Sequence, residues 1–304
     1  MRPLARLAVL AVCRVGKRRQ AGLFVAARHR LYGIEQCPGA LRLHWSTADA
    51  AASAPQIPFD RPRAGAPNLP VEQPTNRVLA ALAHVDRRHW PSSLERVELR
   101  QGYTLLTPNA PIEFMYFPEG ALVGLLHTVG PDGLEAPLAL VGSDGLVGVA
   151  PFLGVPAERL RAEVLHPGSA WRLPAAALNK GPQPDESQLR VVLRYLQELD
   201  AQMSQAALCR LQHTLYQRLS RWLQDAFDRV PGSVLHIEPA TLGTWLGTEP
   251  GAVALATSQL AAEGVVTQQN GRITLLDRAQ LAQRSCGCLQ QVKQQTDPLL
   301  SHTP

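Results

Sequence analysis

Few residues in this sequence have the types and spacing that metal binding requires. Cys286 and Cys288 form a C-x-C pair near the C-terminus, Cys209 lies far upstream, and Cys13 and Cys37 lie near the N-terminus. A structural metal ion needs about four ligands, and no further ligand stands beside the C-x-C pair in the sequence. We therefore predict no metal site and no cofactor.

Catalytic motifs are also missing from the sequence. It contains no paired nucleophile and base and no glycine-rich phosphate loop. The five scattered cysteines lack the paired spacing of secreted scaffolds and indicate a reducing cytoplasm. No apolar run reaches membrane-spanning length. The sequence thus predicts a cytoplasmic protein that is not an enzyme and has no membrane partner.

The stretch TWLGTEPGAVALATSQLAAEGVV, residues 244–266, points to DNA binding instead. It indicates two short helices joined by a turn at Gly247, which is the outline of a helix-turn-helix. Yet no lysine or arginine occurs between Arg229 and Arg272. Hydroxyl and amide side chains are alternative donors to phosphate and adenine. The candidate DNA-contacting residues are Thr248, Glu249, Thr257, Ser258, Gln259, Gln268, Gln269 and Arg272.

The elements around this stretch predict a winged helix over residues 231–292. Pro239 suits the first turn of a helix, and Gly264 suits the end of the second helix. Alternating residues around Asn270 and Gly271 then predict a tight hairpin. Residues 293–304 are expected to form a tail.

A long dimerisation helix and a hinge are predicted upstream, over residues 187–230. The apolar residues of the helix recur at alternating spacings of three and four, as in a coiled coil. The stripe is narrow and flanked by polar residues, which favours a homodimer seam over a helix lying on a neighbouring sheet. The seam residues are Leu189, Val192, Leu196, Leu199 and Met203.

Residues 76–186 read as short strands separated by Gly, Pro and Asp at intervals of about ten residues. This pattern predicts an antiparallel β-roll, preceded by a short helix near Asn76. Together the segments predict an α+β protein with a β-roll, a long dimerisation helix and a C-terminal winged helix.

The positive charge of the chain lies outside these segments. Residues 1–75 hold 11 Lys/Arg against 4 Asp/Glu, whereas the rest of the chain holds 19 against 21. The N-terminal segment is rich in Ala, Arg and Pro and shows no sustained period. We expect a disordered tail or a start codon placed too far upstream; a basic arm that binds nucleic acid is a weaker alternative.

The order of these parts resembles the Crp/Fnr superfamily of bacterial transcription regulators. Several strings carry the resemblance, among them LERVELRQGYTLL, MYFPEGALV, ALVGSDGLVGV and GRITLLDRAQLAQRSCGC. The resemblance covers about residues 76–292. It implies a cytoplasmic homodimer with a cyclic-nucleotide-binding-like sensor domain and paired recognition helices that bind DNA.

The resemblance fails at the positions where relatives bind effectors. Members that bind cyclic nucleotides carry a Gly-Glu pair and an Arg-Ser or Arg-Thr pair. Here the nearest candidates for an effector pocket are Asp144, Arg159 and Arg161, and no hydroxyl residue stands beside either arginine. A phosphate needs a charged donor with supporting donors, so we expect no cyclic nucleotide and leave the effector unknown. Oxygen-sensing members use four cysteines that this chain does not supply in the expected places.

The recognition helix departs from the family in the same way. Relatives carry two arginines where this chain has Glu249 and Pro250, and base-reading positions fall on Pro250, Gly251 and Leu255. Bidentate recognition of guanine needs an arginine or lysine, so the recognition helix is degenerate. The sequence therefore predicts a homodimeric Crp/Fnr-type DNA-binding regulator with weakened DNA contacts. The alternative is a dimeric sensor or interaction module that has lost operator binding and acts by heterodimerising with related regulators.

Overall fold

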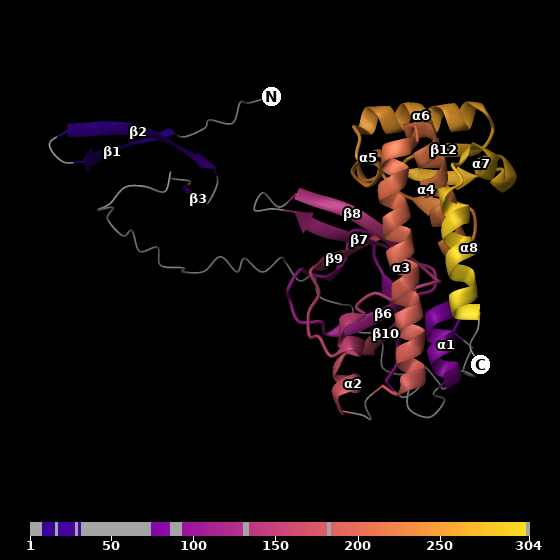
Figure 1. Cartoon of the computed structure of the whole chain (residues 1–304). Helices are drawn as coiled ribbons and strands as arrows, with labels where there is room; N and C mark the ends of the chain where they lie inside the picture. The colour runs from indigo at the N-terminus through magenta and orange to yellow at the C-terminus, as the bar shows by residue number, and fades with distance from the viewer. Residues whose placement is uncertain are drawn as a thin grey trace. The chain divides into compact units, whose positions relative to one another are not determined.

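The computed structural model describes the backbone of residues 8–15, 18–27, 30–31, 74–85, 93–129, 134–180 and 184–301 (Figure 1). The chain divides into two units, Met1–Arg61 and Pro62–Pro304. The first contains strands β1 (Ala8–Val15), β2 (Arg18–Ala27) and β3 (Arg30–Leu31), paired antiparallel in that order. Most of residues 1–75 lie outside the described ranges, so our expectation for this segment stays a prediction.

The second unit begins with an antiparallel β-roll made of two sheets, ordered β4-β10-β6 and β5-β9-β7-β8. Its core is formed by the apolar residues that alternate along these strands, such as Val123 and Leu125 on β7. The strands, in chain order, are β4 (Glu95–Leu99), β5 (Thr104–Leu106), β6 (Phe114–Pro118), β7 (Leu122–Val129), β8 (Leu134–Val141), β9 (Leu160–His166) and β10 (Gly168–Pro174). A 3-10 turn, η1 (Ala150–Leu153), and a short helix, α2 (Ala176–Lys180), complete it.

Helix α1 (Arg77–Val85) is fixed to the roll by the side chain of Asn76. The amide of this buried residue donates to the carbonyls of Pro118 and Gly145, both at 2.8 Å. Its oxygen accepts the N–H of Leu79 at 2.9 Å and so caps the first turn of α1. One polar residue therefore sets both the start of the helix and its position on the sheet.

The long periodic segment, predicted as a dimerisation helix and hinge, forms two helices, α3 (Glu186–Gln212) and α4 (Leu215–Arg229). The break lies at His213, whose backbone is extended, and at Thr214, whose side chain accepts the N–H of Gln217. Gln217 in turn accepts the N–H of Thr214, which completes a capping box. Because a capping box starts a new helix, a hinge separates α3 from α4.

The winged helix follows, with α5 (Pro239–Leu246), α6 (Pro250–Ala262) and a three-stranded sheet ordered β11-β13-β12. The strands are β11 (Val234–His236), β12 (Val266–Gln269) and β13 (Arg272–Leu275). Gly247 ends α5 with φ of +61°, a left-handed conformation that glycine adopts without strain. The predicted α+β order of β-roll, helix and winged helix is thus confirmed.

Two further helices close the chain, α7 (Arg278–Arg284) and α8 (Cys288–Ser301). Helix α8 packs along α3, as Figure 1 shows in yellow and salmon. Residues 293–301 are therefore part of a helix rather than the tail that the sequence analysis expected. The physical reason is an inward face of Leu289, Val292 and Thr296, all buried. None of the described helices is long and apolar enough to cross a membrane.

Candidate functional site

The outer face of α6 is the surface that a winged helix would present to DNA, and it carries no positive charge. Val253, Ala256 and Leu260 point inward and are buried. Outward lie Gly251, Ser258, Gln259, Ala262 and Leu255, and Leu255 is 75% exposed. An exposed leucine can contact a thymine methyl group but cannot bind a phosphate.

Most of the predicted DNA-contacting residues do lie on the surface of the winged helix. Glu249, Ser258, Gln259, Gln269 and Arg272 are exposed, and Thr248 and Gln268 are partly exposed. The side chain of Gln259 donates to Glu263 at 3.2 Å, within α6. Glu263 also accepts a hydrogen bond from the hydroxyl of Tyr216 at 2.8 Å and forms an ion pair with Arg284. The positive charge of Arg284, close to α6, is therefore already paired with a carboxylate.

Thr257 corrects the sequence prediction. Its side chain is 0% exposed, and its hydroxyl donates to the carbonyl of Val253 at 2.8 Å, one turn earlier in α6. Because the hydroxyl is hydrogen-bonded within the helix and the side chain is buried, Thr257 cannot contact DNA.

The three residues proposed for an effector pocket have other partners. Asp144 forms an ion pair with the buried Arg229 of α4, with Oδ2 3.0 Å from Nε. Arg161 pairs with Glu135 on β8 and with Glu163 on its own strand, and Arg159 is exposed. Among the described residues, no hydrogen bond or ion pair joins Asp144 to either arginine.

The five residues proposed for the dimer seam face the interior of their own chain to different degrees. Val192 belongs to a buried cluster with α1, and Leu199 belongs to the core of the β-roll. Leu189, Leu196 and Met203 are partly buried. The seam therefore stays a prediction, with two of its five residues already covered by the chain itself.

A different stripe of α3 is exposed. Leu193, Leu208 and Leu211 lie on the surface, and Leu211 is 79% exposed. Leu193 and Leu211 are eighteen residues apart, which is five helical turns, so they share one face. Polar residues, Gln197, Asp200 and Ser204, lie between them.

The winged helix docks directly onto the β-roll. The indole of Trp245, at the end of α5, lies over Gly124 on β7 so closely that a methyl group added at Gly124 would be 2.1 Å from its Cζ2. Trp245 also packs against Trp222 of α4, with ring centroids 6.4 Å apart. Leucines of the roll share one core with the winged helix: Leu122, Leu126, Leu140 and Leu165.

A pair of histidines lies at a second point of this junction. The backbone N–H of His236 on β11 donates to Nδ1 of His166 on β9 at 3.0 Å, and the two rings are 5.4 Å apart. Burial, and secondarily the neighbouring His236, lowers the pKa of His166 to about 4. His166 is therefore neutral at ordinary pH.

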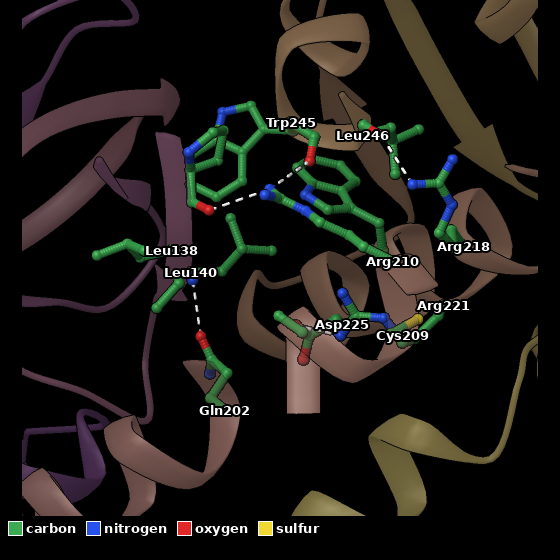
Figure 2. Close-up of a pocket in the computed structure, with 14 residues that line it drawn as sticks. Leu138, Leu140, Gln202, Cys209, Arg210, Arg218, Arg221, Asp225, Trp245 and Leu246 are labelled. Atoms are coloured by element: carbon green, nitrogen blue, oxygen red, sulfur yellow. Dashed lines mark hydrogen bonds and ion pairs between the residues drawn. The ribbon is translucent and has the colours of Figure 1, made fainter. Parts of the chain in front are cut away.

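Figure 2 shows a pocket at the end of α3 that is lined by three arginines, Arg210, Arg218 and Arg221. Arg210 donates to the carbonyls of Pro137 and Trp245, at 3.0 and 3.4 Å, and Arg218 donates to the carbonyl of Leu246 at 3.0 Å. These bonds hold the end of α5 against the roll and α3. Arg210 and Arg218 therefore have a structural role at this junction.

Beside this pocket the structure brings together four side chains that the sequence analysis did not connect. Cys209, His213, Cys286 and Cys288 place their ligand atoms within 4.8 Å of one another. The expectation that the C-x-C pair has no further ligands nearby is therefore wrong. One signal was available in the sequence, because Cys209 and His213 are four residues apart at the end of a helix and so share a face.

Comparisons with known proteins agree with the fold. Residues 217–284 match the family model of the Crp-like helix-turn-helix domain. The structure is similar to a CRP-family regulator, TTHB099, from Thermus thermophilus, with 19% identity and a TM-score of 0.51 over 62% of this chain and 96% of that one. It is similar to FixK2 from Bradyrhizobium japonicum, with 19% identity and a TM-score of 0.53 over 64% and 98%.

A third similar structure is TTHA1359, a CRP/FNR-family transcriptional regulator that also comes from Thermus thermophilus. It shares 22% identity and a TM-score of 0.50 over 63% of this chain and 98% of that one. None of the curated proteins matches the sequence. Identities at this level show a common fold, and the helix-turn-helix match adds the domain type. The chain therefore contains a Crp-like helix-turn-helix domain and has the fold of the CRP/FNR transcriptional regulators.

Proposed function

We propose that this chain is a cytoplasmic, homodimeric regulator that binds DNA weakly and with little base discrimination. The observation that carries the proposal is the outer face of α6, where glycine, alanine, leucine and short polar side chains take the place of cations. Phosphate contacts by Lys and Arg supply most non-specific affinity, and bidentate arginines supply guanine recognition. A helix without them retains only hydroxyl, amide and methyl contacts.

The proposed contacts come from both parts of the winged helix. Ser258 and Gln259 would face the groove from α6, and Thr248 would contact the backbone at the start of that helix. In the wing, Gln268, Gln269 and the exposed Arg272 would contact phosphates. Glu249 at the N-terminus of α6 favours the helix dipole but repels phosphate, which weakens binding further.

The effector of this regulator is not a cyclic nucleotide. Asp144 is engaged by Arg229, and Arg161 is engaged by two glutamates, so neither is free to bind a ribose or a phosphate. Calorimetry with cyclic AMP should therefore detect no binding. Micromolar affinity would contradict this part of the proposal.

The homodimer would form through the exposed stripe of α3. Leu193, Leu208 and Leu211 gain most from burial in a second copy, at about 25 cal/mol per Å² of apolar surface. Leu189 and Leu196 would extend the contact on one side of the stripe. The exposed stripe therefore lies on the face of α3 next to the seam that was predicted from periodicity.

Sedimentation tests the dimer. The double variant Leu193→Asp/Leu208→Asp should be monomeric at micromolar concentration, whereas the wild type should be dimeric. Leu276→Asp is the matched control, because Leu276 is exposed but lies beyond β13. A wild type that is already monomeric would rule out the homodimer.

Fluorescence anisotropy with random-sequence and promoter duplexes tests DNA binding. The plot of log affinity against log salt should be shallow, since each phosphate neutralised adds roughly 0.9 to its slope. Tight, sequence-specific binding with a steep slope would show that another surface reads DNA. A dimer without any binding at low salt would favour the second candidate, an interaction module, which the exposed leucines of α3 also support.

A further inference from the structure

We propose that Cys209, His213, Cys286 and Cys288 form a tetrahedral site for one Zn²⁺ ion that fastens the hinge after α3 to the start of α8. The residues come from two places 77 positions apart in the chain. Cys209 lies in the last turn of α3 and His213 is the residue that ends it. Cys286 lies between α7 and α8, and Cys288 is the first residue of α8.

The distances fit a tetrahedral ion. Zinc bonds of about 2.3 Å to sulfur and about 2.0–2.1 Å to nitrogen place neighbouring ligands about 3.8 Å apart for two sulfurs and about 3.5 Å apart for sulfur and nitrogen. Sγ of Cys209 and Sγ of Cys286 are 3.5 Å apart, and Sγ of Cys288 is 3.6 Å from Nδ1 of His213. All four ligand atoms lie within 4.8 Å of one another. Closure of the site thus needs side-chain shifts of only a fraction of an ångström in the pairs that are measured.

The donor set also selects the ion. Three cysteines with one histidine are a frequent set at structural zinc sites, and four protein ligands leave no position open for a substrate. Thiolates disfavour magnesium and calcium, which take oxygen ligands. The three cysteines are buried and form no disulfide. His213 is partly exposed, so solvent reaches the site on the side of the imidazole.

Packing alone does not account for the cluster. Buried cysteines commonly act as small apolar side chains, and these three do form a buried group of their own. That role would not require an imidazole nitrogen to point at one of the sulfurs. Three thiolates around Zn²⁺ leave a net charge of −1, and Arg221, which lines the pocket with Cys209, supplies a cation nearby. Its buried Nε has no hydrogen-bond partner among the described residues.

The position of the site gives it a structural role. His213 and Thr214 form the hinge between the helix that packs on the sensor roll and the helix that enters the winged helix. A metal bound there would hold this hinge against α8, which itself lies along α3. Metal binding would therefore stabilise the folded chain and fix the direction of α4.

The full-length protein, purified with reductant, provides the first test. Elemental analysis should find about one zinc per chain after reconstitution and dialysis. Co²⁺ added to the metal-free protein should give thiolate-to-cobalt charge transfer and the intense visible bands of a tetrahedral ion, saturating at one equivalent. Bound zinc should also protect three of the five cysteines from alkylation until a chelator is added.

Variants then locate the site. Cys288→Ser and His213→Asn should weaken cobalt binding at least tenfold and change its spectrum. The double variant Cys13→Ser/Cys37→Ser, in the N-terminal segment, and His127→Asn, on β7, are matched controls that should retain one equivalent. Because the alkylation and cobalt experiments use the wild type, a misfolded variant does not remove the test. The proposal is overturned by a reduced wild type that takes up no stoichiometric metal, by equal uptake in Cys288→Ser, or by a Cys209–Cys286 disulfide in place of the metal.

Discussion

The outer face of α6 and the junction at the end of α3 differ sharply in chemistry, although both belong to the C-terminal third of the chain. The first presents a leucine, a glycine and short polar groups, with no cation on α6 itself. The second gathers three arginines, two tryptophans and a cluster of cysteines and histidine. The winged helix is therefore fixed to the β-roll by buried aromatic side chains and by arginine hydrogen bonds, whereas the outer face of α6 carries no cation. Four predictions test this difference between the two regions.

The largest effect is expected at the junction. Trp245→Ala should lower the free energy of unfolding by about 3–5 kcal/mol, because it removes a buried indole from between Trp222 and Gly124 and leaves a cavity. Urea unfolding followed by circular dichroism measures this loss. A loss below about 1 kcal/mol would mean that the winged helix does not depend on the roll.

The second effect concerns DNA. Glu249→Arg with Pro250→Arg should raise affinity for duplex DNA at least about tenfold and steepen the salt slope by up to about 2, since two cations replace one anion and one neutral ring. Leu153→Arg adds one positive charge on the exposed surface of the β-roll, away from α6, and should change the affinity little. If both variants gain equally, α6 is not the surface that faces DNA.

A smaller effect depends on pH. His166 has a pKa of about 4 in the folded chain, below the ordinary value of 6.5, so the unfolded chain binds more protons between these values. Stability should therefore fall as pH is lowered from 6.5 towards 4 and should not change through His166 above 6.5. Protonation of Nδ1 would break the hydrogen bond from His236. Urea unfolding of His166→Gln at pH 7, 6 and 5 should show a flatter profile than the wild type or His84→Gln.

The smallest effect is expected on the outer face of α6. Leu255→Ala should change the free energy of unfolding by no more than about 0.5 kcal/mol, because the leucine is 75% exposed and alanine favours the helix. The same unfolding assay as for Trp245→Ala makes the two directly comparable. A loss above about 1 kcal/mol would show that Leu255 is covered, for example by a second protein.

Much of the fold follows from local patterns. Alternation of apolar residues predicts the strands of the β-roll, and Pro239, Gly247 and Gly264 predict the limits of α5 and α6. The tight hairpin expected at Asn270 and Gly271 is present, with Gln269 paired to Arg272. The absence of cations on α6 is also a property of the sequence, because the interval between Arg229 and Arg272 contains none.

Other features depend on contacts that are distant in the chain. Periodicity shows that α3 has apolar residues on adjacent faces, but only packing against the roll and α8 decides that Val192 is buried and Leu193 exposed. The same limit applies to Thr257, whose polarity suggests a surface position although its hydroxyl bonds within the helix.

Local patterns in the sequence suffice for the strands of the β-roll, the elements of the winged helix, their order and the absence of cations on α6, because these features depend on residues within a few turns of one another. The C-x-C pair after the wing meets Cys209 and His213 at the end of α3 through the packing of distant segments. That meeting requires α8 to run back along α3, an arrangement fixed by the burial of Leu289 and Val292. No local sequence pattern predicts a contact between side chains 77 positions apart. The burial of apolar surface depends on which elements pack together in the fold, and not on their spacing in the chain.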